Sequence, residues 1–338
     1  MRHCNIPIFV PHLGCPHTCV FCNQRTITGQ KAFSVDTVCK TIEQQLATLP
    51  PDAEKEIAFF GGSFTAIDHT LMQTLLSLAE HYVRLGEVAS IRLSTRPDAI
   101  DREILSLLGQ YSVKTIELGI QSSDDTVLSL SERGHTAAQA ETASRLIKEH
   151  GFSLVGQMML GLPGSTEELE IQTAQSMLRW GIDAARIYPT VVFPETALYK
   201  MAKNRSYRPL SVTEAATRCA AVLECFYAAN IPVIRIGLCE TEGLREEKNL
   251  LGAYHPALGE LCLNQYYLRV ILRELSRLSP APHETVVIEV APSALSQALG
   301  QKKSNLLTLK TLYPNRKFLF TPSQKLCGKE VKLYSKEN

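Results

Sequence analysis

The sequence lacks any hydrophobic run long enough to cross a membrane, and its first residues lack the apolar stretch of a secretory signal peptide. It also lacks a charge excess of either sign, because 35 Lys and Arg residues oppose 34 Asp and Glu residues and leave a formal charge of +1. Composition therefore requires no membrane, nucleic-acid or acidic partner. We expect a cytoplasmic protein, and an apolar content of 45% in 338 residues is enough for one large core.

Ten cysteines are present, but they do not form a disulfide scaffold, which is typical of short secreted chains. In a cytosolic protein, tightly spaced cysteines indicate metal or redox chemistry. Three of the ten, Cys15, Cys19 and Cys22, have that spacing. We interpret most of the others as small buried hydrophobes. They are Cys4, Cys39, Cys219, Cys225, Cys239, Cys262 and Cys327.

Short apolar segments alternate with segments of helical period along most of the chain. This alternation predicts βαβ units with a parallel sheet, and we expect a partial (β/α)6 TIM-like barrel with a small C-terminal α+β extension. A doubly wound open sheet has the same periodicity and stays an alternative. In both folds, ligands bind at the carboxyl ends of the strands. Strands are expected at 6–10, 57–60, 91–94, 115–120, 153–160, 184–188 and 233–236, and helices at 35–46, 70–85, 101–108, 137–150, 166–180 and 213–229.

The character of the sequence changes near residue 280, where Ser279–Pro282 resembles a linker. We expect a core barrel over 1–240, a helical extension over 241–280 and a small basic α+β lobe over 281–338. Residues 301–338 hold nine Lys and Arg and two Asp and Glu, a net charge of +7, whereas the first 300 residues carry −6. A basic tail on an acidic body indicates a polyanionic partner, and a solvated tail is the alternative.

The segment Cys15–Cys22 (CPHTCVFC) follows the first expected strand. Three thiolates on so short an arc suit three corners of a 4Fe–4S cluster and leave the fourth iron open to a ligand. Zinc is the main alternative, because a nearby histidine (His3, His12 or His17) would complete a tetrahedral site. Zinc ligands usually form two separated pairs, and the sequence has no second Cys-x-x-Cys. The spacing therefore favours the open cluster.

The spacing CxxxCxΦC after a first strand resembles the signature of the radical S-adenosylmethionine (SAM) superfamily. The resemblance implies that the amino and carboxylate groups of SAM chelate the open iron. It also implies that an electron from a donor such as flavodoxin or ferredoxin cleaves the sulfonium bond, which yields methionine and a 5′-deoxyadenosyl radical. In such a system the cofactor performs the difficult chemistry and the protein positions it.

Two further features fit that resemblance. Gly61 and Gly62, followed by Thr65, come directly after the second strand and resemble the glycine-rich motif that binds the SAM amino group. Phe21, next to the last cysteine, is expected to contact the adenine ring. A simple tight turn and ordinary core packing are the respective alternatives.

Polar residues at later strand ends complete the expected SAM site. Gln121 suits the ribose hydroxyls, and Arg133 suits a carboxylate. The resemblance implies that Gln157 and Gly161 cradle the adenosine and that Ser94 also lies at the cofactor. A surface or ion-paired arginine and ordinary barrel packing remain alternatives.

Several longer segments resemble the radical-SAM half of the elongator catalytic subunit over roughly residues 5–265. They are ELGIQS (117–122), RGHT (133–136), QMMLGLPGS (157–165), RIYPTVVFPETALY (186–199) and RIGL (235–238). The elongator subunit has a longer cysteine spacing and a following acetyltransferase domain, for which this chain has too few residues. Modification of RNA, with tRNA as partner, is the favoured hypothesis. The alternatives are a radical-SAM enzyme for a small molecule such as a tetrapyrrole, and a non-catalytic metal-binding protein.

No residue is assigned as catalytic from the sequence. Arg186 and Tyr188 leave the sixth strand, and one of them is expected to reach the substrate. His255, with Glu240 and Glu242 nearby, is a candidate for proton transfer, although structural hydrogen bonding is the more common role for such residues.

Overall fold

The computed structural model describes residues 3–10, 15, 19–23, 33–239, 244, 249–278 and 284–336. The expected linker at Ser279–Pro282 lies outside these residues, as do His12, His17, Glu240 and Glu242. Within the described part of the chain, no helix is both long and apolar enough to span a membrane.

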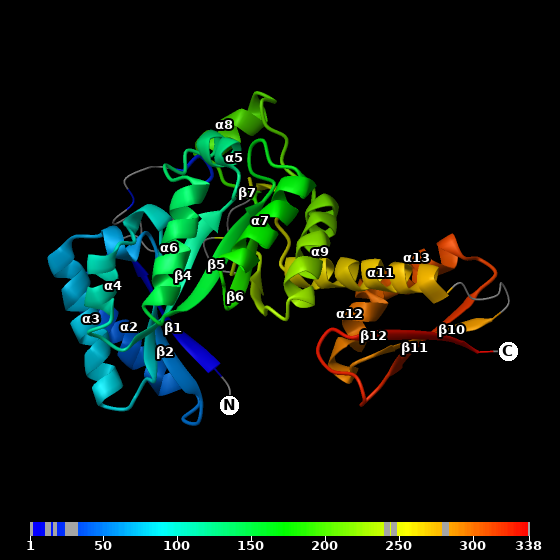
Figure 1. The fold of residues 1–338 in the computed structure, drawn as a ribbon, viewed down its shortest axis with the longest axis horizontal. Coiled ribbons are helices and arrows are strands. Elements are labelled where there is room, and N and C mark those ends of the chain that lie inside the picture. Colours follow the sequence, from blue (N-terminus) through cyan, green and yellow to red (C-terminus); the bar gives the residue numbers. More distant parts are fainter. Residues whose placement is uncertain are drawn as a thin grey trace.

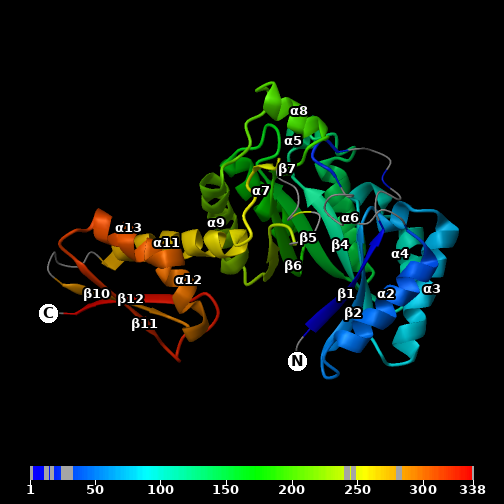
Figure 2. The same ribbon diagram turned by 180° about the vertical axis from the view of Figure 1, so that it is seen from behind.

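Seven parallel strands form one curled sheet in the order β1-β2-β3-β4-β5-β6-β8. The strand order follows the chain order without a reversal, so the sheet is wound in one direction as in a TIM barrel and is open between β1 and β8. This confirms the partial barrel and excludes the doubly wound alternative (Figure 1, Figure 2). The strands are β1 (His3–Val10), β2 (Glu54–Gly61), β3 (Ser90–Thr95), β4 (Val113–Gln121), β5 (Ser153–Leu160), β6 (Ala184–Pro189) and β8 (Val233–Ile236).

Among the described residues, each α-helix between these strands begins after a Ser, Thr or Asp whose side chain accepts a hydrogen bond from a backbone N–H of the first turn. Such caps satisfy donors that the helical ladder leaves free. The helices are α2 (Val35–Thr48), α3 (His69–Arg84), α4 (Arg102–Leu108), α5 (Asp125–Leu130), α6 (Ala137–Glu149), α7 (Glu167–Arg179), α8 (Ala197–Lys203) and α9 (Val212–Ala228). Short 3-10 turns, η1 (Phe64–Ala66) and η2 (Pro97–Ala99), follow β2 and β3.

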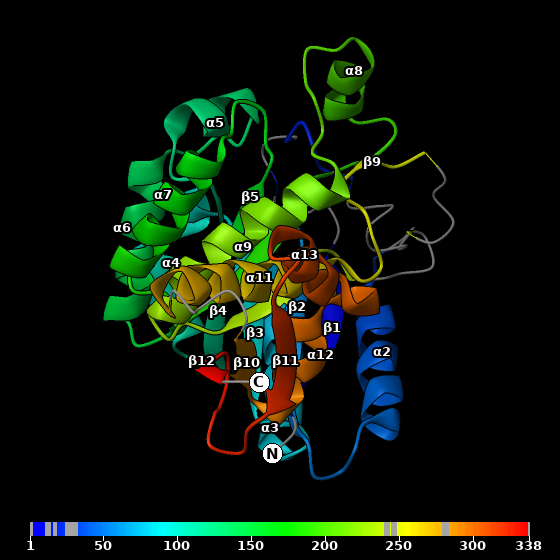
Figure 3. The ribbon, with the colours of Figure 1, turned by 90° about the vertical axis from the view of Figure 1, so that its right-hand side faces the viewer.

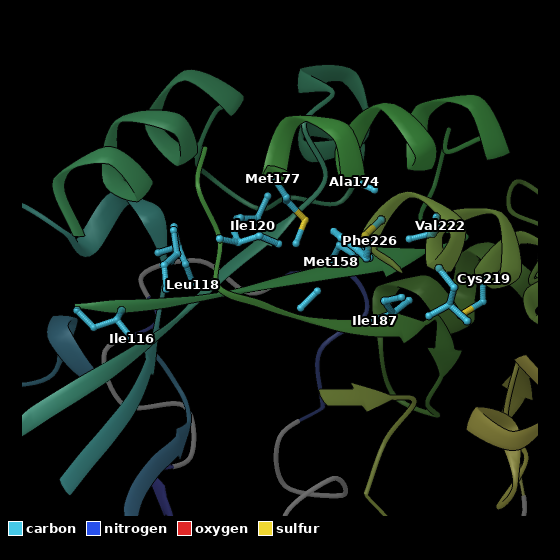
Figure 4. Packing of buried hydrophobic residues seen from close by; sticks show 14 of the residues in the cluster. Ile116, Leu118, Ile120, Met158, Ala174, Met177, Ile187, Cys219, Val222 and Phe226 are labelled. Carbon is cyan, nitrogen blue, oxygen red and sulfur yellow. The ribbon is translucent and has the colours of Figure 1, made fainter. Parts of the chain in front are cut away.

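The main core lies between the sheet and the helices on its convex face. Alternate residues of each strand point outward, and Figure 4 shows those of β4, β5 and β6 packed against α7 and α9. A Cβ at Gly156 would lie 2.5 Å from the terminal methyl of Met177, so a larger residue at this layer would make that flexible side chain shift. The helices thus leave the concave face and the carboxyl edge of the sheet for a site.

The C-terminal part consists of the long helix α11 (Leu258–Leu278) and a three-stranded sheet in the order β11-β10-β12 (Figure 1, Figure 3). The sequence predicts strands at 285–290 and 317–321, and both occur: β10 (Thr285–Val290) pairs in parallel with β11 (Lys317–Pro322). The prediction missed β12 (Val331–Lys336), which is antiparallel to β10 and alternates half-buried with exposed residues. Two short helices, α12 (Leu295–Leu299) and α13 (Ser304–Leu312), lie between β10 and β11.

The scattered cysteines are only partly the buried hydrophobes that we expected. Cys219 and Cys262 are buried in the main core, whereas Cys239 and Cys327 are exposed. All ten cysteines lie in the described part of the chain and none forms a disulfide.

Candidate active site

The cysteine segment lies at the carboxyl edge of the sheet, after β1, where backbone hydrogen bonds fix its second half. The N–H of Val20 donates to the carbonyl of Ser131 at 3.2 Å, and the N–H of Leu198 donates to the carbonyl of Val20 at 2.8 Å. The N–H of Cys22 donates to the carbonyl of Cys19 at 3.0 Å, which closes a tight turn. These bonds join the segment to the C-terminal end of α5 and to the first turn of α8, so the site is assembled from parts far apart in the sequence.

Cys15 and Cys19 share an electropositive environment. Burial raises the pKa of the Cys15 thiol, while a hydrogen bond from the backbone of Ser63 and the charges of Arg96 and Arg133 oppose that rise. The Nη1 of Arg133 donates to the Sγ of Cys19 at 3.3 Å. Donors and cations around thiols favour thiolates, which are the form that binds iron.

The glycine turn after β2 has little room for side chains. Gly61 has a φ of +109°, and a Cβ there would lie 3.2 Å from the carbonyl oxygen of Val10. The N–H of Gly62 donates to that same carbonyl at 2.9 Å. Only glycine adopts such a conformation without strain, so this turn keeps the ends of β1 and β2 in close contact.

A chain of hydroxyl groups fixes the turn to the next strand. Thr65 donates to the carbonyl of Ala99 at 2.6 Å, so the hydroxyl of Thr95 must donate to Thr65, 2.6 Å away. Ser63 then donates to Thr95 at 2.9 Å. The hydroxyl of Thr65, which we predicted at the cofactor, therefore has its hydrogen bonds within this row of hydroxyl groups.

Gln121 and Arg133 are brought together, with atoms that have no partner. Arg133 donates from Nη2 to the carbonyl of Gly119 at 2.7 Å, but its buried Nε has no hydrogen-bond partner. The buried Oε1 of Gln121 also lacks a partner, and this residue has a φ of +66° at a bulge in β4. A free donor and a free acceptor beside the cysteine segment fit a zwitterionic, hydroxyl-bearing ligand such as SAM.

Arg96 belongs to this cluster, although our sequence prediction named only its neighbour Ser94. Arg96 is 4% exposed, forms an ion pair with Asp98 at 2.9 Å and donates to the carbonyl of Arg133. Its Nη1 is buried without a partner. Ser94 donates to the carbonyl of Phe59 at 3.4 Å. The sequence does contain a signal for Arg96: it comes directly after a strand and before a proline, and a residue in that position lies at the ligand-binding edge of the sheet.

His135 supports the same loop as a neutral side chain. Burial, together with the charges of Arg133 and Arg96, lowers its pKa from 6.5 to about 3. Its Nε2 lies 3.2 Å from the carbonyl of Ile120, so Nε2 carries the proton.

This lowered pKa predicts a loss of stability in acid. Between pH 6.5 and about 3 the unfolded chain binds a proton at His135 that the folded chain does not bind, so the free energy of unfolding falls. At pH 5 the expected loss is about 2 kcal/mol. Urea unfolding of wild type and of His135→Gln at pH 7.5 and pH 5 measures it. The exposed His81→Gln variant is the control, and equal pH dependence in wild type and His135→Gln would contradict the prediction.

Gln157 and Gly161 have structural partners. Gln157 donates from Nε2 to Glu117 at 2.7 Å on the concave face. Gly161 has a φ of +75°, and a Cβ there would lie 2.6 Å from Leu210. Its carbonyl accepts a hydrogen bond from the hydroxyl of Tyr207 at 2.6 Å. Gly161 therefore joins β5 to the segment before α9.

The concave face carries a buried network of charges centred on Glu117, which we did not predict. Glu117 accepts hydrogen bonds from Arg92 at 3.0 Å, Arg186 at 2.7 Å and Gln157. Arg92 also pairs with Glu56 at 2.7 Å. Because Arg186 donates to Glu117, only its remaining N–H groups are left for the contact with the substrate that we expected.

Phe21 packs against a small apolar cluster beside the site. The buried members of this cluster are Val20, Val192, Leu198 and Tyr207. Val192 belongs to the short strand β7 (Val191–Val192), which pairs with β9 (Leu251–Gly252). One side of Phe21 is thus fixed by packing near the cysteines.

Within the described residues, no three His, Cys, Asp or Glu side chains converge closely enough for a single metal ion. Two of the histidines that the zinc alternative names, His12 and His17, lie outside these residues. A cuboidal cluster binds each thiolate at a different iron and needs no such convergence.

Comparison with known proteins assigns the chain to a family. Residues 9–176 match the model of the radical SAM superfamily, and residues 182–268 match the radical SAM C-terminal domain. Elongator complex protein 3 of Homo sapiens is 26% identical over 63% of this chain and 48% of its own length. A tRNA uridine(34) acetyltransferase of Methanocaldococcus jannaschii is 26% identical over 60% of this chain and 45% of its own length. An uncharacterized protein of the same organism, MJ0486, is 29% identical over 59% of this chain and 64% of its length.

Solved structures agree on the fold. Elp3 of Methanocaldococcus infernus has a TM-score of 0.53 at 19% identity and covers 66% of this chain and 54% of its own. Methylornithine synthase (PylB) has a TM-score of 0.52 at 13% identity and covers 83% of this chain and 84% of its own. The chain spans about half to two thirds of the length of the curated relatives named above. It belongs to the radical SAM superfamily, as a SAM-dependent enzyme with a 4Fe–4S cluster that is similar to the elongator branch.

Proposed function

We propose that Cys15, Cys19 and Cys22 hold the 4Fe–4S cluster and that the enzyme modifies RNA, with tRNA as its substrate class. The cluster and SAM, when bound, supply the radical chemistry, and the protein binds and orients them. An electron donor such as flavodoxin or ferredoxin is part of the proposal.

The unpartnered atoms beside the cysteines support the proposed SAM site. The Nε of Arg133 suits the SAM carboxylate, and the Oε1 of Gln121 suits a ribose hydroxyl. In this proposal the turn at Gly61 and Gly62 binds the amino group, and Phe21 offers a ring face near the adenine. Ser94, Thr65, Gln157 and Gly161 shape the site in this proposal through the hydrogen bonds already described.

The resemblance to tRNA uridine(34) acetyltransferases supports the RNA assignment most directly, because it covers 60% of this chain. The C-terminal lobe adds a physical reason, since residues 301–338 carry a net charge of +7. A basic surface releases counterions from a phosphate backbone and so binds nucleic acid.

One face of the C-terminal sheet carries three of these nine basic residues. Lys317 and Lys336 both pair with Thr285, and Tyr334 and Leu319 both pair with Val287, so all four share one face. Lys332 lies on the same face opposite Glu289. Tyr334 is 36% exposed and Leu319 is 42% exposed. Lysines around an exposed aromatic ring suit a nucleotide strand, because the lysines bind phosphates and the ring stacks on a base.

Turnover with tRNA tests the proposed function. The reconstituted, reduced enzyme is expected to form 5′-deoxyadenosine several times faster with tRNA than without it, and deuterated tRNA is expected to transfer label to that product. Tetrapyrrole substrates in the same assay test the small-molecule alternative. Transfer from a tetrapyrrole and none from tRNA would reject the RNA assignment.

Replacing Lys317, Lys332 and Lys336 by Gln is expected to weaken tRNA binding about tenfold or more at low salt and to reduce its salt dependence by up to about three ion equivalents. Fluorescence anisotropy with labelled tRNA over a salt series measures both. The matched control replaces Lys40, Lys55 and Lys114 by Gln. Equal losses in the two triple variants would show that only net charge matters and that the sheet face is not the binding surface.

A further inference from the structure

A cavity of about 430 Å³ lies between the carboxyl end of β8 and the beginning of α11. Arg235, Tyr254 and His255 contribute to its lining. Strand β7 separates it from the cysteine segment, because Val191 lines the cavity while Val192 packs with Val20. Adjacent residues of a strand point to opposite sides, so the cavity is adjacent to the proposed cofactor site but distinct from it.

Arg235 introduces a positive charge that the described residues do not neutralise. Arg235 on β8 is paired in register with Arg186 on β6, so both side chains point to the concave face of the sheet. Arg186 is paired with Glu117 at 2.7 Å. Arg235, in contrast, makes no ion pair among the described residues, and its Nε is buried without a hydrogen-bond partner. Arg235 is half-buried, and a buried N–H group such as this Nε is costly unless a ligand or water accepts its hydrogen bond.

The beginning of α11 adds further donors to the cavity. The helical ladder starts where Leu261 donates to Ala257, and the N–H groups of Gly259 and Glu260 have no partner within the described chain. At the N-terminus of a 21-residue helix, such groups carry a partial positive charge.

His255 is a donor as well. Its Nδ1 accepts a hydrogen bond from the N–H of Ala257 at 3.0 Å, so the proton of the neutral ring is on Nε2. Among the described lining residues Glu260 is the one carboxylate, and its charge acts on Lys329 of the C-terminal part. It lies outside ion-pair distance of Arg235 in the described structure, so the described lining residues offer more donors than acceptors.

We propose that this cavity is a subsite for a phosphate group of the substrate, with Arg235 as its main ligand. A guanidinium, an imidazole N–H and free N–H groups at a helix N-terminus together suit an oxyanion. The subsite rests on the proposed function in one respect: on an RNA substrate the group is a backbone phosphate, whereas on a small substrate it is a phosphate ester. In either case it anchors the substrate one strand away from the cofactors.

Inorganic phosphate is the first probe. The melting temperature of wild type is expected to rise with phosphate until it saturates, relative to chloride at equal ionic strength. Arg235→Gln is expected to bind phosphate at least tenfold more weakly and to melt, without phosphate, no lower than wild type, because no ion pair is lost. Arg235→Lys is expected to be intermediate. Arg84→Gln, at a side chain that is 79% exposed, is the control and should respond like wild type.

No saturable rise in wild type, or an equal rise in Arg235→Gln, would overturn the proposal. Modification by phenylglyoxal, followed by peptide mass spectrometry, is a test without a variant: phosphate should protect Arg235 and leave Arg84 unprotected, and equal modification of Arg235 with and without phosphate would also overturn it.

Competition identifies the source of the phosphate. A short RNA oligonucleotide that displaces inorganic phosphate more strongly than a nucleoside 5′-monophosphate supports an RNA backbone, and the reverse supports a small phosphate ester. A protein that binds phosphate at Arg235 but shows no turnover with tRNA would retain the subsite and lose the RNA assignment.

Discussion

Cys19→Ala is expected to abolish cluster assembly. After anaerobic reconstitution the wild type should contain about 4 Fe per chain, and the variant less than about 1, because two thiolates cannot hold a cuboidal cluster with an open iron. Reductive cleavage of SAM should fall to background for the same reason. Iron analysis, the visible absorption of the cluster and 5′-deoxyadenosine formation measure these effects. Cys15→Ala and Cys22→Ala are expected to behave alike.

Variants at two other cysteines are the controls, and they distinguish the loss of a cluster ligand from the loss of a structural side chain. Cys327 is exposed in the C-terminal part, so Cys327→Ala should keep full iron content and activity. Cys219 is fully buried in the core, so Cys219→Ala should lose stability while it still assembles the cluster. Normal iron content and SAM cleavage in Cys19→Ala would reject the proposed ligand set.

The second large effect is expected at Glu117, the centre of the buried network. Its side chain is 0% exposed and neutralises Arg92 and Arg186. Glu117→Ala leaves both guanidinium groups without this partner, and breaking a buried pair typically costs about 3–5 kcal/mol. Urea unfolding should show this loss. Glu117→Gln, which keeps the shape and the contact to Gln157, should fall between wild type and alanine.

Glu149→Ala is the matched control. Glu149 also contacts two arginines, at 2.6 Å and 3.4 Å, but its side chain is 41% exposed. Solvent screens such pairs, so the expected loss is below about 1 kcal/mol. If Glu117→Ala were no less stable than Glu149→Ala, the network would not contribute to the stability of the barrel.

Local pattern was sufficient for most of the barrel elements. Strand β5 and strand β8 occur at the predicted residues, and the predicted helix at 213–229 corresponds to α9 at Val212–Ala228. These segments bury one face or both, so their apolar residues follow the period of the element. Strand β12 was missed because its exposed positions carry Lys332, Tyr334 and Lys336, and an edge strand with one solvated face has a weak apolar signal.

Contacts between distant segments could not be predicted in this way. Arg133 and Cys19 are 114 residues apart in the chain, yet their side chains are 3.3 Å apart in the structure. Glu117 collects partners from β3, β5 and β6, and no local spacing indicates which of them meet. That Arg235 has no ion pair among the described residues, unlike Arg92 and Arg186, is likewise visible only in the tertiary structure.

Residue spacing alone indicated the family of this protein. The pattern is three cysteines in one short segment after a strand, followed by glycine and polar residues at successive strand ends. That information is local, because cluster chemistry and strand periodicity both act over a few residues. The order of the strands, which excluded a doubly wound sheet, depended on the tertiary structure. So did the charge network of the concave face and the separate cavity behind β7. Pairing of strands and neutralisation of buried charges are long-range events, and their outcome depends on which segments come together in space.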